Sequence, residues 1–291
     1  MRKTIEFNIE SSQDGLLIKT VLSKQMGLSR REISRLKFAH GILINQQEAR
    51  VTQPVHTGDL VTLIFPEKDT PHAIRLMNRP DILYEDEDIV IVNKPSGMVC
   101  HPSHEHLDDD MGTLLQNYYG NGFTIRAVGR LDKDVSGIMV YAKNQPAAAR
   151  LSHQRSQDVL HKVYDAVAQG TFESDHGTLT YSLSKVEGRK DRKITADGQK
   201  CITDYTVVDV IHDLSVLKVS ILTGRTHQIR AGMANAGHPL CGDTLYGGST
   251  ERIPRPALHC GHVELLQPFT GKKITVDCDL PDDMKRLLTE E

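Results

Sequence analysis

The chain has 291 residues, which is enough for a sizeable hydrophobic core and for more than one domain of ordinary size. Its composition, with 38% hydrophobic and 25% charged residues, is that of an ordinary globular protein, and its formal net charge of −3 excludes a histone-like polycation. Binding to nucleic acid would therefore depend on local basic patches.

The amino terminus, MRKTIEFNIE, alternates charged and apolar residues and lacks the apolar core of a signal peptide. No stretch approaches the roughly 20 apolar residues that a membrane-spanning helix needs. We therefore predict a cytoplasmic protein with no membrane partner. The five cysteines are scattered, odd in number and without a C-x-x-C pair, so we predict neither a disulfide framework nor a zinc site, and we expect reduced, mostly buried thiols at Cys100, Cys201, Cys241, Cys260 and Cys278.

Residues 13–65 have the pattern of a small separate module. Apolar residues at helical spacing predict a first helix: Leu16, Leu17, Val21, Leu22 and Met26. A second helix begins at Ser29, which forms an S-x-x-E capping box with Glu32, and Gly41 ends it. The short alternating segments ILIN and LVTLIF then predict two strands separated by a turn.

This order of elements resembles the S4 RNA-binding domain. Its second helix carries four basic residues, with two of them one turn apart on a common face: Arg30, Arg31, Arg35 and Lys37. On general grounds, such residues on a short amphipathic helix are more often a solvated face than a binding site. The resemblance reverses that preference and implies that they bind RNA phosphates, with an affinity that depends on salt and hardly on base sequence.

Residues 66–81, PEKDTPHAIRLMNRPD, contain three prolines and many polar residues, which is typical of a linker. The remaining residues, 82–291, alternate strand-like and helix-like pieces. Several strands follow one another through short turns, so we predict a mixed α+β domain and not a doubly wound parallel fold. The expected strands lie within 82–97 and at 138–143, 161–170, 203–211, 215–222 and 273–278, and the expected helices lie at 113–119, after Asn144 as N-cap, at 226–235 and at 281–288.

The segment GRLDKDVSG, residues 129–137, precedes a short apolar run and places Asp132 on a turn bounded by glycines. Arg130 and Lys133 flank this carboxylate, and nearby positive charge favours its ionised form. An ionised carboxylate can attack an electrophilic carbon, which makes Asp132 a candidate nucleophile. The alternative is a plain loop that leads into a buried strand, and these residues alone favour that alternative.

Other segments change that balance. The chain carries, in order, NKPSGMVCHPS at 93–103, HKVYDAVAQG at 161–170, TGRTHQIR at 223–230, HPLCGDTLYGG at 238–248 and ALHCGHVELLQPFTGK at 257–272. Together with GRLDKDVSG, these motifs resemble the RluA-type pseudouridine synthases, which isomerise uridine within ribosomal or transfer RNA. The agreement runs from about Ile82 to Leu280. It departs from the family's usual HRLDxxTSG at Gly129 and Val135, which we interpret as the mark of a divergent subgroup.

The resemblance implies an α+β pseudouridine-synthase fold with a long mixed, mainly antiparallel sheet and a central RNA-binding cleft, preceded by the small α+β S4-like domain. The reaction breaks the bond from C1′ to N1, rotates the uracil and joins its C5 to C1′, without a cofactor or a metal ion. Asp132 can attack C1′ or C6, or accept the proton at C2′ to give a glycal, and the sequence leaves these routes open. All of them require an ionised carboxylate in a dry site.

Arg230, the last residue of TGRTHQIR, matches the family's partner arginine. A buried carboxylate needs a cation, and a planar guanidinium suits it better than lysine, although an arginine that only crosses the helix surface is the alternative. Tyr164 would stack on the base and could take the C5 proton, whereas a tyrosine in a strand is otherwise a packing residue. Ile229 and Leu258 match positions that pack against the uracil.

The target base lies inside a folded RNA and must be flipped out, so phosphate contacts have to offset the cost of flipping. The family match places Arg130 in the vacated stack. Arg225 and Thr226 lie at a predicted helix start, where backbone N–H groups and a guanidinium bind phosphate well. Lys94 and Lys162 would add to a basic rim. We expect RNA, ribosomal or transfer, as the partner of a monomeric enzyme.

Two other interpretations compete with the synthase. The segment HPSHEHLDDD, with His101, His104, His106 and Asp108–Asp110, could hold the metal of a hydrolase, but its spacing matches no metal-ligand pattern and a solvated loop fits better. A non-catalytic RNA-binding protein is the other, because the S4-like half could act alone. Insensitivity to chelator would argue against the hydrolase. Conversion that Asp132→Asn abolishes, with RNA affinity retained, would argue against the binding protein.

Overall fold

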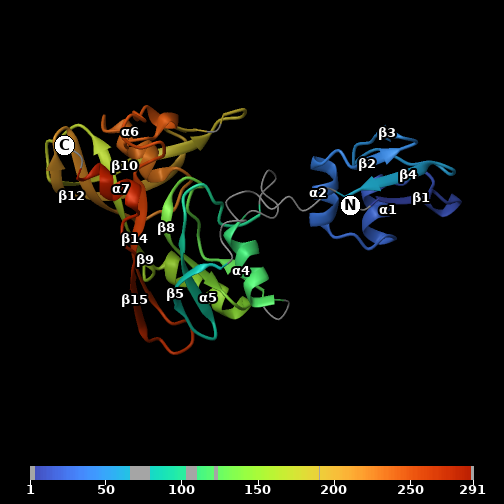
Figure 1. The fold of residues 1–291 in the computed structure, drawn as a ribbon, viewed down its shortest axis with the longest axis horizontal. Coiled ribbons are helices and arrows are strands. Elements are labelled where there is room, and N and C mark those ends of the chain that lie inside the picture. Colours follow the sequence, from blue (N-terminus) through green and yellow to red (C-terminus); the bar gives the residue numbers. More distant parts are fainter. Residues whose placement is uncertain (1–3, 66–78, 103–109, 121–123, 190, 290–291) are drawn as a thin grey trace. The chain divides into compact units, whose positions relative to one another are not determined.

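The computed structural model describes residues 4–65, 79–102, 110–120, 124–189 and 191–289. They form two compact units, each with its own sheet (Figure 1). The first unit holds residues 4–65, and the second holds residues 79–101 together with the described residues from Asp110 onward. Among the helices of these described ranges, none is long and apolar enough to cross a membrane.

The first unit combines two helices with a four-stranded antiparallel sheet in the order β1-β4-β2-β3. β1 pairs with β4 from Thr4↔Ile64 to Asn8↔Leu60. Partners so far apart leave no local signal, so the sequence placed the start of the module at residue 13, after this strand. The elements are β1 (Thr4–Asn8), η1 (Ser11–Gln13), α1 (Ile18–Lys24), α2 (Arg30–Phe38), β2 (Ile42–Ile44), β3 (Gln47–Glu48) and β4 (Leu60–Ile64).

Both ends of α2 are defined by specific contacts. The Ser29 N–H donates to Glu32 Oε2 at 2.8 Å and the Glu32 N–H donates to Ser29 Oγ at 3.2 Å, which is the predicted capping box. After the helix, Gly41 is required because a Cβ there would lie 2.1 Å from the carbonyl oxygen of Ile64. The helices pack on the sheet through a fully buried core: Ile18, Val21, Leu22, Leu36, Val61 and Leu63.

The second unit is built on an eleven-stranded sheet that is mixed and mainly antiparallel, as predicted. The order is β11-β10-β12-β13-β9-β14-β8-β6-β5, with β15 paired to β14 and β7 paired to β8. The pair β14 and β8 is parallel. The strands are β5 (Asp81–Glu85), β6 (Ile89–Lys94), β7 (Arg126–Ala127), β8 (Ser136–Ala142), β9 (His161–Gln169), β10 (His176–Lys185), β11 (Arg192–Ile194), β12 (Gln199–Ile211), β13 (Leu214–Ile221), β14 (Leu258–Leu266) and β15 (Lys273–Asp277).

Helices of the second unit pack against different strands of this sheet: α5 contacts β8, and α6 contacts β10 and β12. Asn144 caps α5 as predicted, because its Oδ1 accepts from the Ala147 N–H at 2.8 Å. α6 begins at Gln228 and not at residue 226, since His227 has a left-handed φ of 59°. The elements are α4 (Met111–Tyr119), α5 (Gln145–Ser156), α6 (Gln228–Asn235), η3 (Thr244–Tyr246) and α7 (Asp282–Leu287).

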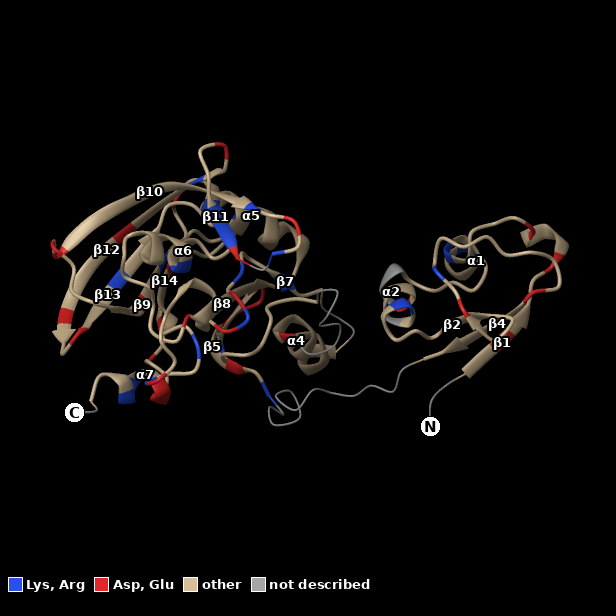
Figure 2. Ribbon diagram, turned by 90° about the horizontal axis from the view of Figure 1, so that it is seen from above, with Lys and Arg blue, Asp and Glu red and all other residues tan. Residues whose placement is uncertain are grey.

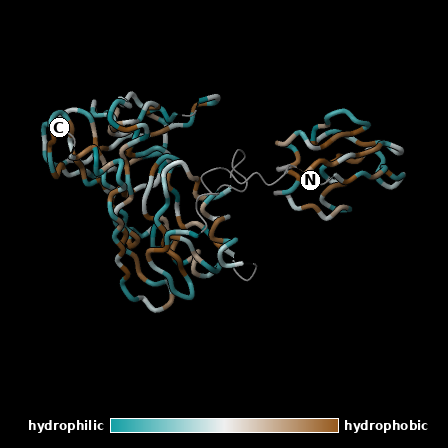
Figure 3. Tube along the Cα trace, in the orientation of Figure 1, coloured by the Kyte–Doolittle hydropathy of each residue, from teal (hydrophilic) through white to brown (hydrophobic). Residues whose placement is uncertain are grey.

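Apolar residues follow the strands of each unit, whereas the loops are largely hydrophilic (Figure 3). Every residue of β8 is buried, which agrees with the apolar run after GRLDKDVSG. Acidic and basic positions are interspersed over the second unit and do not form faces of a single sign (Figure 2). All five cysteines are free thiols and four of them are buried, as predicted.

β8 and β14 approach closely where they run parallel. Cys260 lies opposite Gly137, which has a φ of 106°, and a Cβ at Gly137 would lie 2.3 Å from the Cys260 carbonyl oxygen. Only glycine fits such an approach. Ser136 Oγ lies 2.9 Å from His259 Nδ1 and joins the two strands. The loop that precedes β8 therefore lies beside the start of β14.

Candidate active site

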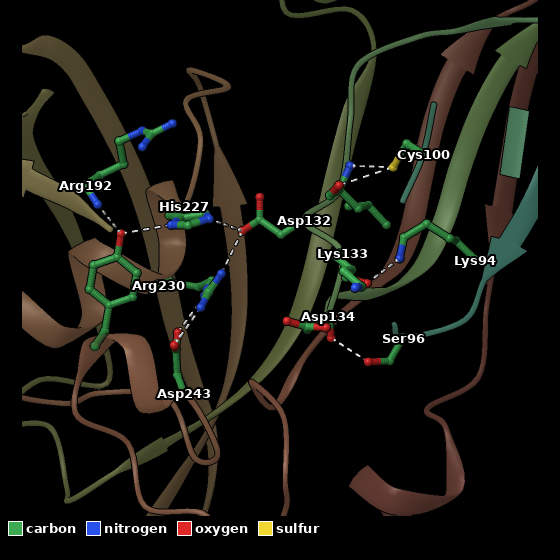
Figure 4. A network of polar contacts seen from close by, with 12 residues as sticks. Lys94, Ser96, Cys100, Asp132, Lys133, Asp134, Arg192, His227, Arg230 and Asp243 are labelled. Carbon is green, nitrogen blue, oxygen red and sulfur yellow. Dashed lines mark hydrogen bonds and ion pairs between the residues drawn. The ribbon is translucent and has the colours of Figure 1, made fainter. Parts of the chain in front are cut away.

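Asp132 lies in the loop between β7 and β8, and the segment that follows β6 holds this loop (Figure 4). The carbonyl oxygen of Lys133 accepts from the Gly97 N–H at 2.9 Å and from the Lys94 ammonium at 3.1 Å. These contacts involve the residue directly after Asp132, so they restrict the direction of its side chain.

Further contacts hold the loop on both sides of the carboxylate. Cys100 Sγ lies 3.2 Å from both the backbone nitrogen and the carbonyl oxygen of Leu131. The Ser96 hydroxyl donates to the carbonyl oxygen of Asp134 at 2.9 Å. The segment NKPSGMVC thus supports the loop that carries Asp132, because residues spread along this segment contact successive backbone groups of the loop.

The position of Lys94 corrects our expectation that this residue belongs to a basic rim. Its side chain is fully buried, and Nζ donates to the carbonyl oxygens of Pro95, Met98 and Lys133 at 2.9, 2.7 and 3.1 Å. Burial disfavours the charged ammonium and lowers the pKa of Lys94 to about 8. A lysine this deep cannot contact RNA; it holds the loop.

Arg230 reaches Asp132 from α6. Its Nη1 donates to Asp132 Oδ2 at 3.3 Å, and the side chains of Arg230 and Asp132 are 7% and 15% exposed. Arg230 also makes a two-pronged ion pair with Asp243, from Nε to Oδ2 at 2.6 Å and from Nη2 to Oδ1 at 2.7 Å. Asp243 therefore fixes the plane of the guanidinium and leaves Nη1 for Asp132.

The charge of Arg230 is secured by its two carboxylate neighbours. Burial opposes that charge, but the hydrogen bonds and charge of Asp243, together with the charge of Asp132, outweigh burial and raise the pKa of Arg230 above its ordinary value. One guanidinium shared by two carboxylates cannot neutralise both. Arg230 therefore holds the Asp132 carboxylate in place without fully neutralising its negative charge.

His227 approaches the same oxygen of Asp132, with its Nε2 at 3.8 Å from Oδ2. On the far side of the ring, Nδ1 lies 3.0 Å from the hydroxyl oxygen of Tyr246, which also accepts the backbone N–H of Arg192 at 2.8 Å. Burial lowers the pKa of His227 more than the nearby Asp132 raises it, so the imidazole is neutral at neutral pH.

A cavity of about 430 Å³ opens beside Asp132. Its lining comes from the loop before β8, from the end of α5, from β9, from the turn before α6, from α6 itself and from the start of β14. The sheet order, in which β14 lies between β9 and β8, brings these segments together. The lining includes the eight residues of this unit that the sequence predicted as catalytic or substrate-binding: Arg130, Asp132, Tyr164, Arg225, Thr226, Ile229, Arg230 and Leu258.

One wall of the cavity is apolar. Ile229, Leu258 and Tyr164 are 5%, 3% and 5% exposed. Burial, and to a smaller extent the nearby Cys260 and Asp132, raises the pKa of the Tyr164 hydroxyl well above its ordinary value. Tyr164 is therefore a neutral phenol whose ring is mostly covered by the sheet.

Basic side chains outnumber the single acidic one, Asp158, among the exposed residues that line the cavity. Arg130, Arg155 and Arg225 line the cavity, are exposed, and have no acidic partner among the residues that the structure describes. Lys162 also lines it, half-buried, with Nζ donating to the Ile138 carbonyl oxygen at 3.1 Å. Unpaired guanidinium groups at a cavity mouth suit phosphate oxygens.

The two departures from the family motif have different surroundings. Gly129 has a φ of 82°, and a Cβ there would lie 3.0 Å from Nη1 of Arg155, so the arginine occupies space that a larger residue would need. Val135 is 2% exposed, and an apolar side chain at this depth needs no hydrogen-bond partner. Glycine at position 129 therefore alters the rim of the cavity, whereas valine at position 135 leaves the surroundings of Asp132 unchanged.

Comparison with known proteins agrees with this geometry. A family model described as RNA pseudouridylate synthase matches residues 88–235, and one described as the RluD ribosomal pseudouridine synthase N-terminal domain matches residues 5–61. The chain belongs to the RNA pseudouridylate synthase family. The first match includes Asp132 and Arg230, while Asp243 and Leu258 lie beyond its end.

Relatives share nearly the whole chain. An uncharacterized RNA pseudouridine synthase of Bacillus subtilis, YjbO, is 36% identical over 273 residues, which cover 92% of this chain and 96% of that protein. A ribosomal large subunit pseudouridine synthase D of Zymomonas mobilis is 32% identical, with 89% and 88% covered. The structure of human RNA pseudouridylate synthase domain containing 1 shares the fold, with a TM-score of 0.58 at 24% identity over 70% of this chain and 84% of that one. The predicted activity is thereby confirmed: this is an RNA pseudouridine synthase.

The four basic residues predicted to bind RNA lie on α2. The side chains of Arg30, Arg31 and Arg35 are outside the described part of the structure. Lys37 is exposed, with Nζ 5.3 Å from the centre of the Phe38 ring.

The segment considered for a metal site is mostly outside the described residues, since 103–109 include His104, His106 and Asp108. Asp110 has a structural role instead, because it is fully buried and caps α4, with Oδ1 accepting from the Thr113 N–H at 2.9 Å. In the described part of the chain, no group of three or more His, Cys, Asp or Glu side chains is placed to hold a metal ion.

Sequence reasoning gave no role to Asp243 or His227, although both lie in motifs that it quoted. Asp243 is the only acidic residue of the segment HPLCGDTLYGG. Acidic residues are rarely buried without a partner, so an acid in such a segment predicts a buried cation beside it. That signal could have paired Asp243 with Arg230. No comparable signal exists for His227, because its contact with Asp132 depends on the left-handed turn before α6.

Proposed function

We propose that this pseudouridine synthase modifies ribosomal RNA and that Asp132 is its catalytic carboxylate. The single observation that supports Asp132 most strongly is the 3.3 Å contact with Arg230 in the lining of the cavity. Ribosomal RNA is supported by the names of relatives, among them the ribosomal large subunit pseudouridine synthase D of Zymomonas mobilis and that of Nitrosomonas europaea.

The proposed chemistry begins with an ionised Asp132 facing an extruded uridine. Attack at C1′ or C6 and removal of the C2′ proton all start from this carboxylate. Arg230 keeps it oriented and, because Asp243 takes two of the guanidinium's hydrogen bonds, does not fully neutralise it. The residues contribute position and electrostatics, and the uracil stays in the cavity while it rotates.

The apolar wall would hold the uracil during that rotation. Ile229 and Leu258 offer surface without hydrogen-bonding groups, so they restrain the ring without fixing its orientation. Tyr164 would pack on the base and give its hydroxyl to the C5 end. As a neutral phenol it can take the C5 proton only if it releases its own proton in the same step, which directs that proton toward Asp132 or solvent.

RNA binding is proposed for two regions. At the cavity, Arg130 would fill the stack that the base leaves, while Arg225, Thr226 and Arg155 would bind the neighbouring phosphates. In the first unit, α2 would bind RNA through Arg30, Arg31, Arg35 and Lys37. This corresponds to an S4-like domain at 13–65, preceded by β1, a linker at 66–81 and a catalytic domain at 82–291. We further propose a monomer that works in the cytoplasm.

The test is a map of pseudouridines across total RNA from cells with and without the gene. We expect at least one ribosomal position to lose its pseudouridine, and we expect a wild-type copy, but not an Asp132→Asn copy, to restore it. A lost position in transfer RNA would correct the substrate. A map that is identical in both strains, or full restoration by Asp132→Asn, would contradict the proposal.

A further inference from the structure

The two carboxylate oxygens of Asp132 have different surroundings. Oδ2 faces Arg230 Nη1 at 3.3 Å and His227 Nε2 at 3.8 Å, and the contacts drawn in Figure 4 converge on this one oxygen. Oδ1 has no hydrogen-bond partner in the described part of the chain. A carboxylate held through one oxygen presents the other to the cavity.

The hydrogen-bond chain behind His227 indicates which ring nitrogen carries its proton. The backbone N–H of Arg192 donates to the hydroxyl oxygen of Tyr246 at 2.8 Å. The hydroxyl hydrogen of Tyr246 is then available for His227 Nδ1, which lies 3.0 Å away. A neutral imidazole that accepts at Nδ1 carries its proton on Nε2. We assign His227 this tautomer, in which the Nε2–H faces Asp132.

We propose that His227 is a positioning residue for Asp132: through its Nε2–H, it holds Oδ2 together with Arg230 and so directs Oδ1 to the uridine. This inference rests on the proposed role of Asp132. At 3.8 Å the contact is too long for a hydrogen bond and acts as an electrostatic guide in a mostly buried site.

The surroundings of His227 keep the ring in this place. The ring meets Tyr246 edge to face, with 5.8 Å between ring centres and an angle of 89°. The residue itself is the N-cap of α6 with a φ of 59°, and the next residue, Gln228, is buried and accepts from the Arg225 N–H at 3.1 Å and the Thr223 hydroxyl at 2.8 Å. The turn that carries the imidazole is therefore fixed on both sides.

The charge of the imidazole matters as much as its position. The groups that act on it are Asp132, Asp243, Arg230, Arg192 and the Tyr246 hydroxyl. A neutral ring orients Asp132 without cancelling its charge. A protonated ring would form a second ion pair with Oδ2 and make the carboxylate less reactive, so the conversion rate should decline as the pH falls through the pKa of this ring, which burial lowers below the ordinary value of a histidine.

Three variants separate this role from a structural one. His227→Gln places an amide N–H near the position of Nε2, whereas His227→Asn reaches only the position of Nδ1, although asparagine suits the left-handed turn better. Tyr246→Phe removes the hydroxyl that fixes the tautomer. The measurement is the single-turnover rate of pseudouridine formation with excess enzyme, using ribosomal RNA from cells that lack the gene, over a range of pH, together with RNA affinity and thermal unfolding.

We expect His227→Asn to slow conversion by about 100-fold, His227→Gln and Tyr246→Phe by about tenfold or less, and RNA affinity to change less than about twofold. The acid decline of the rate should move to lower pH in His227→Gln. Equal rates for the glutamine and asparagine variants, a rate for His227→Asn within about threefold of wild type, or an unchanged pH profile would overturn the inference alone. A wild type that converts nothing would overturn the proposed function, and this inference with it.

Discussion

The inner end and the rim of the cavity use arginine in opposite ways. At the inner end, Arg230 is 7% exposed and is bound to Asp243 and Asp132 at fixed distances. At the rim, Arg130, Arg155 and Arg225 are exposed and have no acidic partner among the residues that the structure describes. The same side chain thus orients a carboxylate at one end and offers a free charge at the other.

This difference between paired and unpaired arginines indicates which physical property matters in each region. A buried ion pair adds little to the stability of the fold, but removal of one partner is strongly destabilising because it leaves an unpaired buried charge. At the inner end, the positions of the paired groups therefore matter more than the number of charges. The proposed role of the exposed rim arginines is to neutralise RNA phosphates, so their number should set the RNA affinity. If this comparison is right, substitutions at the inner end change the rate of conversion, and substitutions at the rim change RNA affinity and its salt dependence.

After the loss of the Asp132 carboxylate itself, the largest effect is expected for Asp243→Asn. Without this carboxylate, Arg230 turns to Asp132 with more of its donors and makes the catalytic oxygen less available. We expect the single-turnover rate to fall by about 100-fold and the free energy of unfolding to fall by about 3–5 kcal/mol, as for a broken buried pair. Asp213→Asn is the matched control, because Asp213 pairs with Arg252 at an exposed site. Equal effects of the two variants would contradict the claim that the buried pair at the inner end matters more than an exposed ion pair.

A smaller effect is expected for Lys94→Met. Methionine fills a similar volume but removes the ammonium donor from the carbonyl oxygens of Pro95, Met98 and Lys133, of which that of Lys133 keeps the Gly97 N–H. Chemical denaturation should show a loss of about 2–3 kcal/mol, and conversion should slow because the loop carrying Asp132 is released. Lys218→Met, at a half-exposed ion pair on β13, should cost less than about 1 kcal/mol. RNA affinity that drops while stability stays constant would return Lys94 to the rim.

The rim arginines sharpen the comparison from the other side. Arg155→Ala and Arg225→Ala should each weaken RNA binding and reduce the slope of log affinity against log salt by about 1, while the rate at saturating enzyme stays within about threefold of wild type. Fluorescence titrations at several salt concentrations measure the slope. Arg252→Ala, at an exposed ion pair outside the cavity lining, should leave it unchanged. A loss of rate at saturation would place these arginines with the inner end.

The smallest effect is expected in the pH dependence of stability, through His259 at the junction of β8 and β14. Burial lowers the pKa of His259, which bridges Ser136 and the Cys278 carbonyl oxygen. Below about pH 6.5 the unfolded chain binds a proton that the folded ring resists, so stability falls with falling pH by up to about 1.4 kcal/mol per unit. Denaturation curves between pH 5 and 8 should show a shallower slope in His259→Gln and an unchanged slope in His176→Gln, an exposed position. Identical slopes in all three proteins would refute this origin.

The sequence predicted the residues of the cavity better than the contacts among them. Asp132 and Arg230 were paired through the family resemblance, and the eight predicted residues of the second unit share one lining. The first fold element was outside the predicted module because β1 finds its partner β4 more than fifty positions away. Strand pairing at such a distance depends on the whole sheet, which no local pattern contains.

The burial of individual polar residues was the property least predictable from the sequence. Lys94 looked like a surface cation, yet it is fully covered, and its ammonium donates to two carbonyl oxygens of its own segment and to that of Lys133, which lies near it only in the fold. The exchange at Gly129 gives a similar lesson: its meaning depends on Arg155, which lies on another element at 3.0 Å from where a Cβ would be. Asp243 received no role because its place in an apolar segment was not used as a signal of burial, and its contact with Arg230 forms where α6 and η3 meet.

The most direct test of the account is single-turnover conversion by Asp132→Asn at enzyme concentrations that saturate RNA binding, with Asp134→Asn, the neighbouring exposed carboxylate, as the control. The account predicts that Asp132→Asn binds RNA like wild type and that its conversion falls by roughly 10⁴-fold or more, while Asp134→Asn keeps the wild-type rate. Conversion by Asp132→Asn within about tenfold of wild type, with RNA equally bound, would contradict it.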